Sequence, residues 1–149
     1  MMTTTYDLIS AHPFLDGLDQ RWLELLSHRA HRSVRHPGHR LFREGGVADR
    51  FWLIRGGRVA LDLHLPGRGQ VVVETLGPDT VVGWSWLFQP YRWHFGAVAT
   101  EETLTVEFDA ARVRELCDQQ PALGYELSLR FMAVMLDRLQ TTRIRLLSE

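Results

Sequence analysis

The chain has 149 residues and a mass of 17.2 kDa, the size of one ordinary domain. Hydrophobic residues make up 45% of it and charged residues 23%, and 17 basic side chains face 18 acidic ones for a net charge of -1. This balance excludes a broad polyanion-binding surface of the histone kind. All basic residues are arginine, which excludes lysine Schiff-base chemistry and a phosphate-loop lysine.

Cysteine usage and hydropathy indicate the compartment. The single cysteine, Cys117, cannot form an intramolecular disulfide, which favours a reducing environment. No apolar run approaches the roughly 20 residues that span a bilayer, and the N-terminus lacks a basic start followed by an apolar core. We therefore expect a cytoplasmic protein that neither crosses nor binds a membrane.

The first two zones of the chain are predicted to be helices and then strands. Residues 5–30 have helical apolar spacing, and Asp19 is placed to cap a helix that begins at Gln20. Residues 31–108 contain short apolar or alternating runs separated by glycine and proline pairs, which is typical of a barrel or roll. The pair Gly56-Gly57 predicts a tight hairpin between two such strands.

Residues 109–149 are predicted to be helical again. Asp109 is placed as a cap, and Pro121 begins a further helix of 25 or more residues, about 40 Å long. Two apolar lines run along this helix. One follows alternating steps of four and three residues through Tyr125, Leu129, Met132, Leu136 and Leu139; the other contains Leu127, Phe131 and Val134. The first line predicts a homodimer interface, and the alternative is that both lines pack into one core.

A family resemblance lies in residues 37–61. The stretch reads Pro37-Gly38, then Leu41-Phe42, then Glu44-Gly45, an aromatic and aliphatic strand, and Gly57-Arg58-Val59. This pattern resembles the cyclic nucleotide-binding domain, particularly the sensor domain of bacterial regulators of the catabolite-activator and fumarate-nitrate-regulator type. The resemblance covers about residues 10–147. It implies a mainly β fold, a jelly-roll-like β-roll with flanking helices and a long C-terminal helix. We expect one domain over residues 1–149 and, unlike in the regulators of this family, no helix-turn-helix domain.

The expected ligand site departs from that family. In the family, a phosphate-binding cassette presents a short helix to the cyclic phosphate, its Glu binds the ribose 2′-hydroxyl, and its Arg pairs with the phosphate. Gly83 and Leu87 match this pattern, but Trp84 stands at the Glu position and Trp93 at the Arg position. Arg92 lies one residue early, and such a slip in a strand points a side chain to the opposite face.

Three readings of this aromatic stretch remain open: an ordinary cyclic nucleotide such as cAMP or cGMP, a different small ligand, or a pocket filled by its own side chains. In the first two, Arg92 would clamp an anion, and an indole ring would stack on the ligand. The candidate ligand-binding residues are Gly83, Trp84, Ser85, Trp86, Leu87, Arg92, Trp93 and His94. No other cofactor is predicted.

Other constellations have structural readings. The four histidines His28, His31, His36 and His39 have no nearby cysteine, so no metal site is predicted. Glu44 is expected to hold the adjacent turn, Asp62 and His64 to line a solvated strand face, and the arginines of the C-terminal helices to face solvent. No nucleophile motif appears, so no catalytic residue is proposed and the protein is not expected to be an enzyme.

These observations favour a non-catalytic sensor module, in which a ligand in the roll shifts the C-terminal helix and a protein partner reads the shift. The first alternative is a ligand-free interaction or scaffold subunit with an aromatic-filled pocket. The second is transcription regulation through a separate DNA-binding partner, because direct DNA binding is not expected without a recognition helix.

Overall fold

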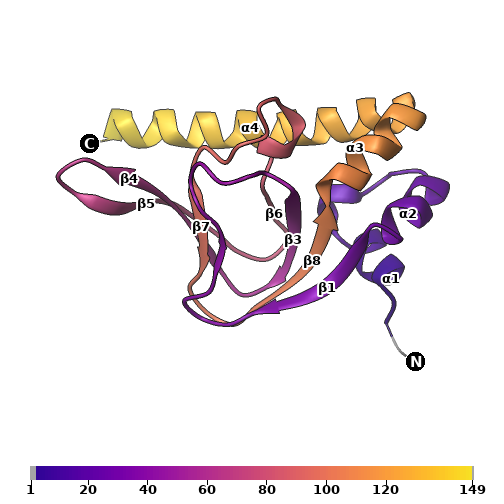
Figure 1. Ribbon diagram of the computed structural model, residues 1–149, viewed down its shortest axis with the longest axis horizontal. Coiled ribbons are helices and arrows are strands. Elements are labelled where there is room, and N and C mark those ends of the chain that lie inside the picture. Colours follow the sequence, from indigo (N-terminus) through magenta and orange to yellow (C-terminus); the bar gives the residue numbers. More distant parts are fainter. Residues whose placement is uncertain (1–2, 149) are drawn as a thin grey trace.

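The computed structural model describes residues 3–148 as two four-stranded sheets flanked by helices at both ends of the chain (Figure 1). The N-terminal part contains α1 (Thr5–Ser10), the 3₁₀ helix η1 (Pro13–Leu15) and α2 (Gln20–Ser27). The helical expectation for this part is confirmed. The Asp19 carboxylate accepts a hydrogen bond from the backbone N–H of Arg21, so it caps α2 as predicted.

Eight strands form the roll, which confirms the predicted fold class. They are β1 (Ala30–Arg35), β2 (Arg40–Phe42), β3 (Arg50–Gly56), β4 (Val59–Leu65), β5 (Gly69–Leu76), β6 (Val81–Val82), β7 (Gly96–Ala99) and β8 (Thr103–Asp109). One sheet has the order β1-β8-β3-β6 and the other β2-β7-β4-β5. All pairs are antiparallel, and the short 3₁₀ helix η2 (Ser85–Leu87) lies between β6 and β7.

The expected hairpin at Gly56-Gly57 is wrong. β3 and β4 do not pair with each other, so this turn is the corner where the chain leaves one sheet and enters the other. Gly57 has φ +89°, and a Cβ there would lie 2.4 Å from the carbonyl oxygen of Glu102. Only glycine fits this corner, because both the left-handed backbone and the close approach exclude a side chain.

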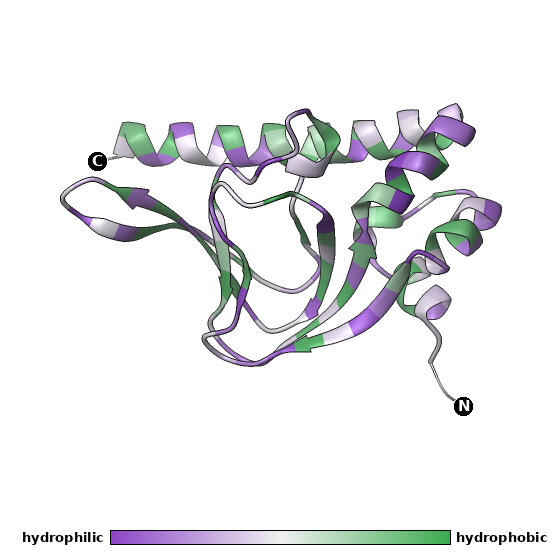
Figure 2. Cartoon of the chain, in the orientation of Figure 1, coloured by the Kyte–Doolittle hydropathy of each residue, from purple (hydrophilic) through white to green (hydrophobic). Residues whose placement is uncertain are grey.

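The C-terminal part contains α3 (Ala110–Gln119) and the 28-residue α4 (Pro121–Ser148), which lies along one side of the roll (Figure 1). Asp109 caps α3 as predicted. Figure 2 shows green and purple alternating along α4. Leu127 and Phe131 are buried against the domain, whereas Tyr125 and Leu136 are more than half exposed. The two predicted apolar lines therefore face different surroundings.

No helix among residues 3–148 is long and apolar enough to cross a membrane.

Candidate functional site

The interior of the roll, between the two sheets, is filled by aromatic side chains. Trp93 stacks on Phe42 of β2 with ring centroids 3.8 Å apart and planes at 16°, and its ring centroid lies 6.2 Å from that of Trp52 on β3. Phe42 also stacks on Trp52 at 5.5 Å. Trp93 is 3% exposed. The side chain at the family's arginine position therefore bridges the two sheets as hydrophobic core.

Gly83 shows how tightly the Trp93 ring is seated. It has φ +99°, and a Cβ there would lie 2.9 Å from Cη2 of the indole. The other end of the ring reaches Gly46, where a Cβ would lie 3.6 Å from Cδ1. The indole thus spans the space from the first cassette residue to the loop after β2, and glycines leave room for it at both ends.

Trp86 lies on the opposite side of the sheet from Trp93. It is fully buried, stacks on Phe51 at 4.8 Å and meets Phe131 of α4 edge-on at 5.5 Å. Phe51 and Trp52 are neighbours on β3 and point to opposite faces, so the two indoles are separated by the sheet. Trp86 therefore joins η2 to α4 and does not line the interior of the roll.

The remaining cassette residues do not converge on one point. Ser85 is buried and its Oγ lies 3.2 Å from Nδ1 of the exposed His94, while Leu87 is half-buried. Arg92 is exposed, and its backbone forms an isolated β-bridge with Val47. Among residues 3–148 its guanidinium makes no hydrogen bond or ion pair. The Arg92 side chain therefore points away from the interior of the roll, as expected for a residue one position before Trp93.

Trp84 connects the cassette to α4. Its ring lies under the guanidinium of Arg138, whose Cζ is 4.6 Å from the ring centroid. Arg138 is 8% exposed, and its Nη2 donates to the carbonyl oxygen of Val81 at 2.6 Å. Burial lowers the pKa of Arg138, and the charges of Glu74 and Asp137 oppose this effect. The expectation that the α4 arginines face solvent is therefore wrong for Arg138.

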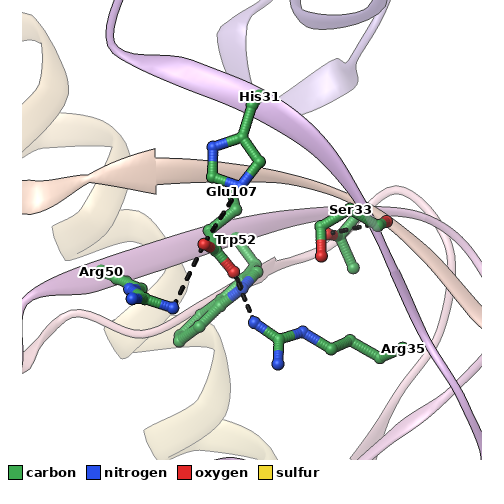
Figure 3. A network of polar contacts seen from close by, with 7 residues as sticks. His31, Ser33, Arg35, Arg50, Trp52 and Glu107 are labelled. Carbon is green, nitrogen blue, oxygen red and sulfur yellow. Dashed lines mark hydrogen bonds and ion pairs between the residues drawn. The ribbon is translucent and has the colours of Figure 1, made fainter.

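A buried carboxylate that the sequence analysis did not identify lies beside the aromatic stack (Figure 3). Glu107 of β8 is 4% exposed. Its Oε1 accepts hydrogen bonds from Arg35 at 2.6 Å and from the indole N–H of Trp52 at 2.8 Å. Its Oε2 lies 3.3 Å from both His31 and Arg50. The available signal was one acid in the apolar strand 103–108, but its partners are scattered along the sequence.

Burial raises the pKa of Glu107, but the hydrogen bonds from Arg35 and Trp52 and the charge of Arg50 together outweigh it. The pKa of this carboxyl is therefore held below its ordinary value. The ionised carboxylate also fixes the Trp52 ring against Phe42. Its role in the roll is to orient an aromatic side chain, because Oε1 accepts two hydrogen bonds and Oε2 faces the side chains of His31 and Arg50.

A second buried ion pair lies on the other sheet. Asp62 accepts two hydrogen bonds from Arg40, at 3.0 and 2.6 Å, and is 3% exposed. The Arg40 hydrogen bonds hold its pKa below the ordinary value although burial raises it. The expectation of a solvated face is wrong for Asp62, which lies at a bulge in the β4–β5 pairing and is buried against the Arg40 guanidinium. Glu44 accepts a hydrogen bond from the backbone N–H of His64, which is a structural role.

The four histidines near the N-terminal helices are spread over separate elements. His28 caps the end of α2, His31 lies on β1 beside Glu107, and His36 and His39 flank the turn before β2. Between residues 3 and 148, no three His, Cys, Asp or Glu side chains are placed to hold a metal ion. A cavity of about 560 Å³ lies between α4 and the β5–β6 turn. A cavity of about 240 Å³ opens at the rim of the roll, beside Trp52 and Trp93.

A roll of two four-stranded sheets, a short helix between β6 and β7 and a long closing helix define a small regulatory binding domain. The chain belongs to the cyclic nucleotide-binding domain family, whose model matches residues 34–120. This family is generally regulatory and non-catalytic. The resemblance stated from the sequence is thereby confirmed, although the ligand of this chain is not identified by it.

Solved structures agree with this assignment. A protein from Geobacter metallireducens, described as a cyclic nucleotide-binding protein, has a TM-score of 0.82 and 26% identity over 93% of this chain and 99% of its own. A cyclic nucleotide-binding domain from Methylobacillus flagellatus has a TM-score of 0.80 and 17% identity over 97% and 81%. The catabolite activator protein of Thermus thermophilus has a TM-score of 0.71 and 22% identity over 90% of this chain and 61% of its own. A search of curated protein sequences found no match.

Proposed function

We propose that this protein is a non-catalytic interaction module that keeps its roll filled with aromatic side chains in place of a cyclic nucleotide. The observation that carries this proposal is the burial of Trp93 between Phe42 and Gly83, at the position where the family has its phosphate-binding arginine. This is the ligand-free alternative from the sequence, and it is favoured over the sensor because a buried indole stands at the position of the arginine side chain that would bind the phosphate.

The energetics point in the same direction. A cyclic nucleotide would have to displace a buried indole, and losing such a ring from a core costs about 3–5 kcal/mol. Trp84 also supplies no carboxylate for the ribose 2′-hydroxyl, and an unmade hydrogen bond to a charged group costs about 1.5–3 kcal/mol. Together these penalties correspond to a more than thousandfold weaker affinity for cAMP or cGMP than that of a site with both family side chains.

Titration of cAMP and cGMP tests this proposal, with tryptophan emission and the thermal midpoint as readouts. We expect no saturable change for the wild type. The double variant Trp84→Glu, Trp93→Arg restores the two family side chains, and we expect it to gain binding of at least one nucleotide. Trp93→Phe keeps an aromatic ring and is the matched control, without gain. Saturable binding by the wild type would contradict the proposal.

The second candidate function is the sensor, favoured by the contact between Trp84 and Arg138, which links the cassette to α4. A ligand that moves Trp84 would then move the helix. The discriminating result is a saturable response to a nucleotide that Arg92→Ala abolishes and Arg68→Ala, at an exposed arginine of the β4–β5 turn, preserves.

We further propose that the working form is a homodimer joined through α4. The support is the exposure of one continuous apolar line on a helix whose other side is buried: Tyr125, Leu129, Met132, Leu136 and Leu139 are 42–60% exposed. Their alternating steps of four and three residues fit a two-helix seam. Leu136→Glu should halve the mass measured by sedimentation, whereas Asp137→Ala beside it should not. An unchanged mass for Leu136→Glu would remove the dimer.

A further inference from the structure

The chain has a basic segment that its near-zero net charge conceals. Between Glu24 and Glu44 there is no acidic residue. The same stretch carries five arginines and four histidines: Arg29, Arg32, Arg35, Arg40, Arg43, His28, His31, His36 and His39. β1 lies in the middle of this segment and carries His31, Arg32 and Arg35, while the other basic residues lie in the segments on either side of it.

β1 is an edge strand. One of its sides pairs with β8 over six residue pairs, from Ala30 with Phe108 to Arg35 with Thr103. In the described part of the chain, no strand pairs with the other side, and Figure 1 shows β1 along the outer margin of its sheet. The backbone N–H and C=O groups along that side can accept a further strand.

The face of β1 that points into the roll carries more positive than negative charge (Figure 3). His31 and Arg35 lie beside Glu107, together with Arg50 of β3. One carboxylate thus has two arginines and a histidine around it, and the His31 side chain is 68% exposed. Glu107 can neutralise only one of the two guanidinium charges, so a carboxylate from another molecule could pair with the other.

The other face of β1 combines unpaired positive charge with exposed apolar surface. Arg32 is exposed. The pKa of Arg55 is lowered first by the burial of Arg55 itself and second by the nearby charge of Arg32. Val34 and its cross-strand partner Leu104 are 48% and 36% exposed. No carboxylate among residues 3–148 forms an ion pair with Arg32 or Arg55, although Glu101 and Glu102 lie in the turn before β8. Within the described residues, these two neighbouring guanidiniums therefore carry positive charge without an ion-pair partner.

We infer that the free edge of β1 binds an extended, acidic and partly apolar segment of a partner protein, which adds to the sheet as a ninth strand. Main-chain hydrogen bonds would supply the pairing, Arg32 and Arg35 would select carboxylates on both faces, and Val34 with Leu104 would receive an aliphatic side chain. Charge complementarity favours this occupant. The inference goes beyond the proposed function and does not require the filled roll or the dimer.

A peptide fits these observations better than a nucleic acid backbone. Phosphates would satisfy the arginines, but they would leave the strand edge unpaired and the Val34–Leu104 pair exposed to water. An added peptide strand covers both. The strand also offers charges on alternate faces, which matches the alternation of side chains in an extended peptide and not the single charged edge of a nucleic acid strand.

Fluorescence anisotropy on the full chain tests this site. The probe is a fluorescein-labelled eight-residue peptide of the sequence Glu-Glu-Val-Val-Glu-Glu-Val-Val, which carries carboxylates and aliphatic side chains on both faces of an extended strand. It is long enough to cover the six residues of β1. A peptide with glutamine in place of glutamate removes the charge, and one with two prolines removes backbone donors. A 20-nucleotide DNA duplex is the competing class of ligand.

We expect the acidic peptide to bind, and Arg32→Glu to weaken it about tenfold while Arg68→Ala leaves the affinity within about twofold. The glutamine and proline peptides should bind at least about fivefold more weakly, and 0.5 M salt should reduce the affinity of the acidic one. Circular dichroism verifies that Arg32→Glu is folded. Equal binding of the glutamine peptide, indifference to Arg32→Glu, no binding, or tighter binding of DNA would each overturn the inference. None of these outcomes bears on the nucleotide titration.

Discussion

Replacing Trp93 by alanine tests whether the aromatic filling of the roll is a structural core. The ring is 3% exposed, stacks on Phe42 at 3.8 Å and abuts Gly83, so little can move in to fill the space. Removing a buried tryptophan side chain costs about 3–5 kcal/mol, and partial relaxation would place the loss near the middle of that range. For a chain of this size, about 4 kcal/mol lowers the thermal midpoint by roughly 8–16 °C.

Urea unfolding followed by circular dichroism measures this loss, because the readout does not depend on the deleted fluorophore. Phe88→Ala is the matched control, since Phe88 is 51% exposed and its removal should change stability by no more than about 0.5 kcal/mol.

The vacated space should also bind free indole. At a hundred times its Kd, indole would restore about 2.7 kcal/mol to Trp93→Ala and nothing to the wild type. A loss as small as that of Phe88→Ala, with no rescue, would show that Trp93 does not fill the roll in solution.

Three further predictions concern the ion pairs and the corner. The depressed pKa of Glu107 means that its contribution to stability is present above about pH 4.5 and is lost as the pH falls through the folded-state pKa, so Glu107→Gln should flatten the acid limb of a pH–stability curve. Asp62→Asn should cost about 3 kcal/mol in urea unfolding, because it leaves the Arg40 guanidinium without its counter-charge; a loss below about 0.5 kcal/mol would contradict the burial of this pair. Gly57→Ala should destabilise by about 2 kcal/mol more than Gly67→Ala in thermal melts, since both have positive φ but only Gly57 lies against backbone; equal losses would refute the close approach.

Local signals in the sequence predicted the helices because each signal acts within one element. Asp19 and Asp109 cap the helices that follow them, and Pro121 begins α4. The corner at Gly56-Gly57 could not be predicted in the same way. Two glycines between apolar runs specify a reversal, but which strands then pair depends on β7 and β8, more than 30 residues downstream.

The candidate site was predicted only in part. The sequence placed Trp86 and Trp93 in one aromatic stretch, and the structure separates them by a sheet, because η2 and the residues after it carry the chain around the end of β6. The substitution of Trp93 for the family's arginine was visible, but its consequence depends on Phe42 and on glycines at positions 46 and 83. The contacts of Trp93 with Phe42 and Gly46 join residues far apart in the sequence, and no periodicity records them.

Arg138 was misjudged for a related reason. It continues the line of Leu127, Phe131 and Val134 along α4, but its charge favoured a solvated position, and the ring of Trp84 that covers its guanidinium comes from a distant part of the chain. Glu107 was missed because its partners belong to β1 and β3. Long polar side chains are thus assigned correctly only when the neighbouring strands are known.

Because α4 is one continuous helix, a small rotation of it within the domain would displace its C-terminal end by a larger distance. Phe131 anchors the helix in the core, and Ser148 lies 17 residues further on, about 25 Å away along the axis. A tilt of about 10° at the anchor would swing that tip by roughly 4 Å, nearly the pitch of one helical turn. In the sensor alternative, a ligand that displaces Trp84 and Arg138 would therefore move Ser148 further than it moves Arg138, because Ser148 lies further from Phe131 along the helix, and it would break the hydrogen bond from Arg145 to Val73.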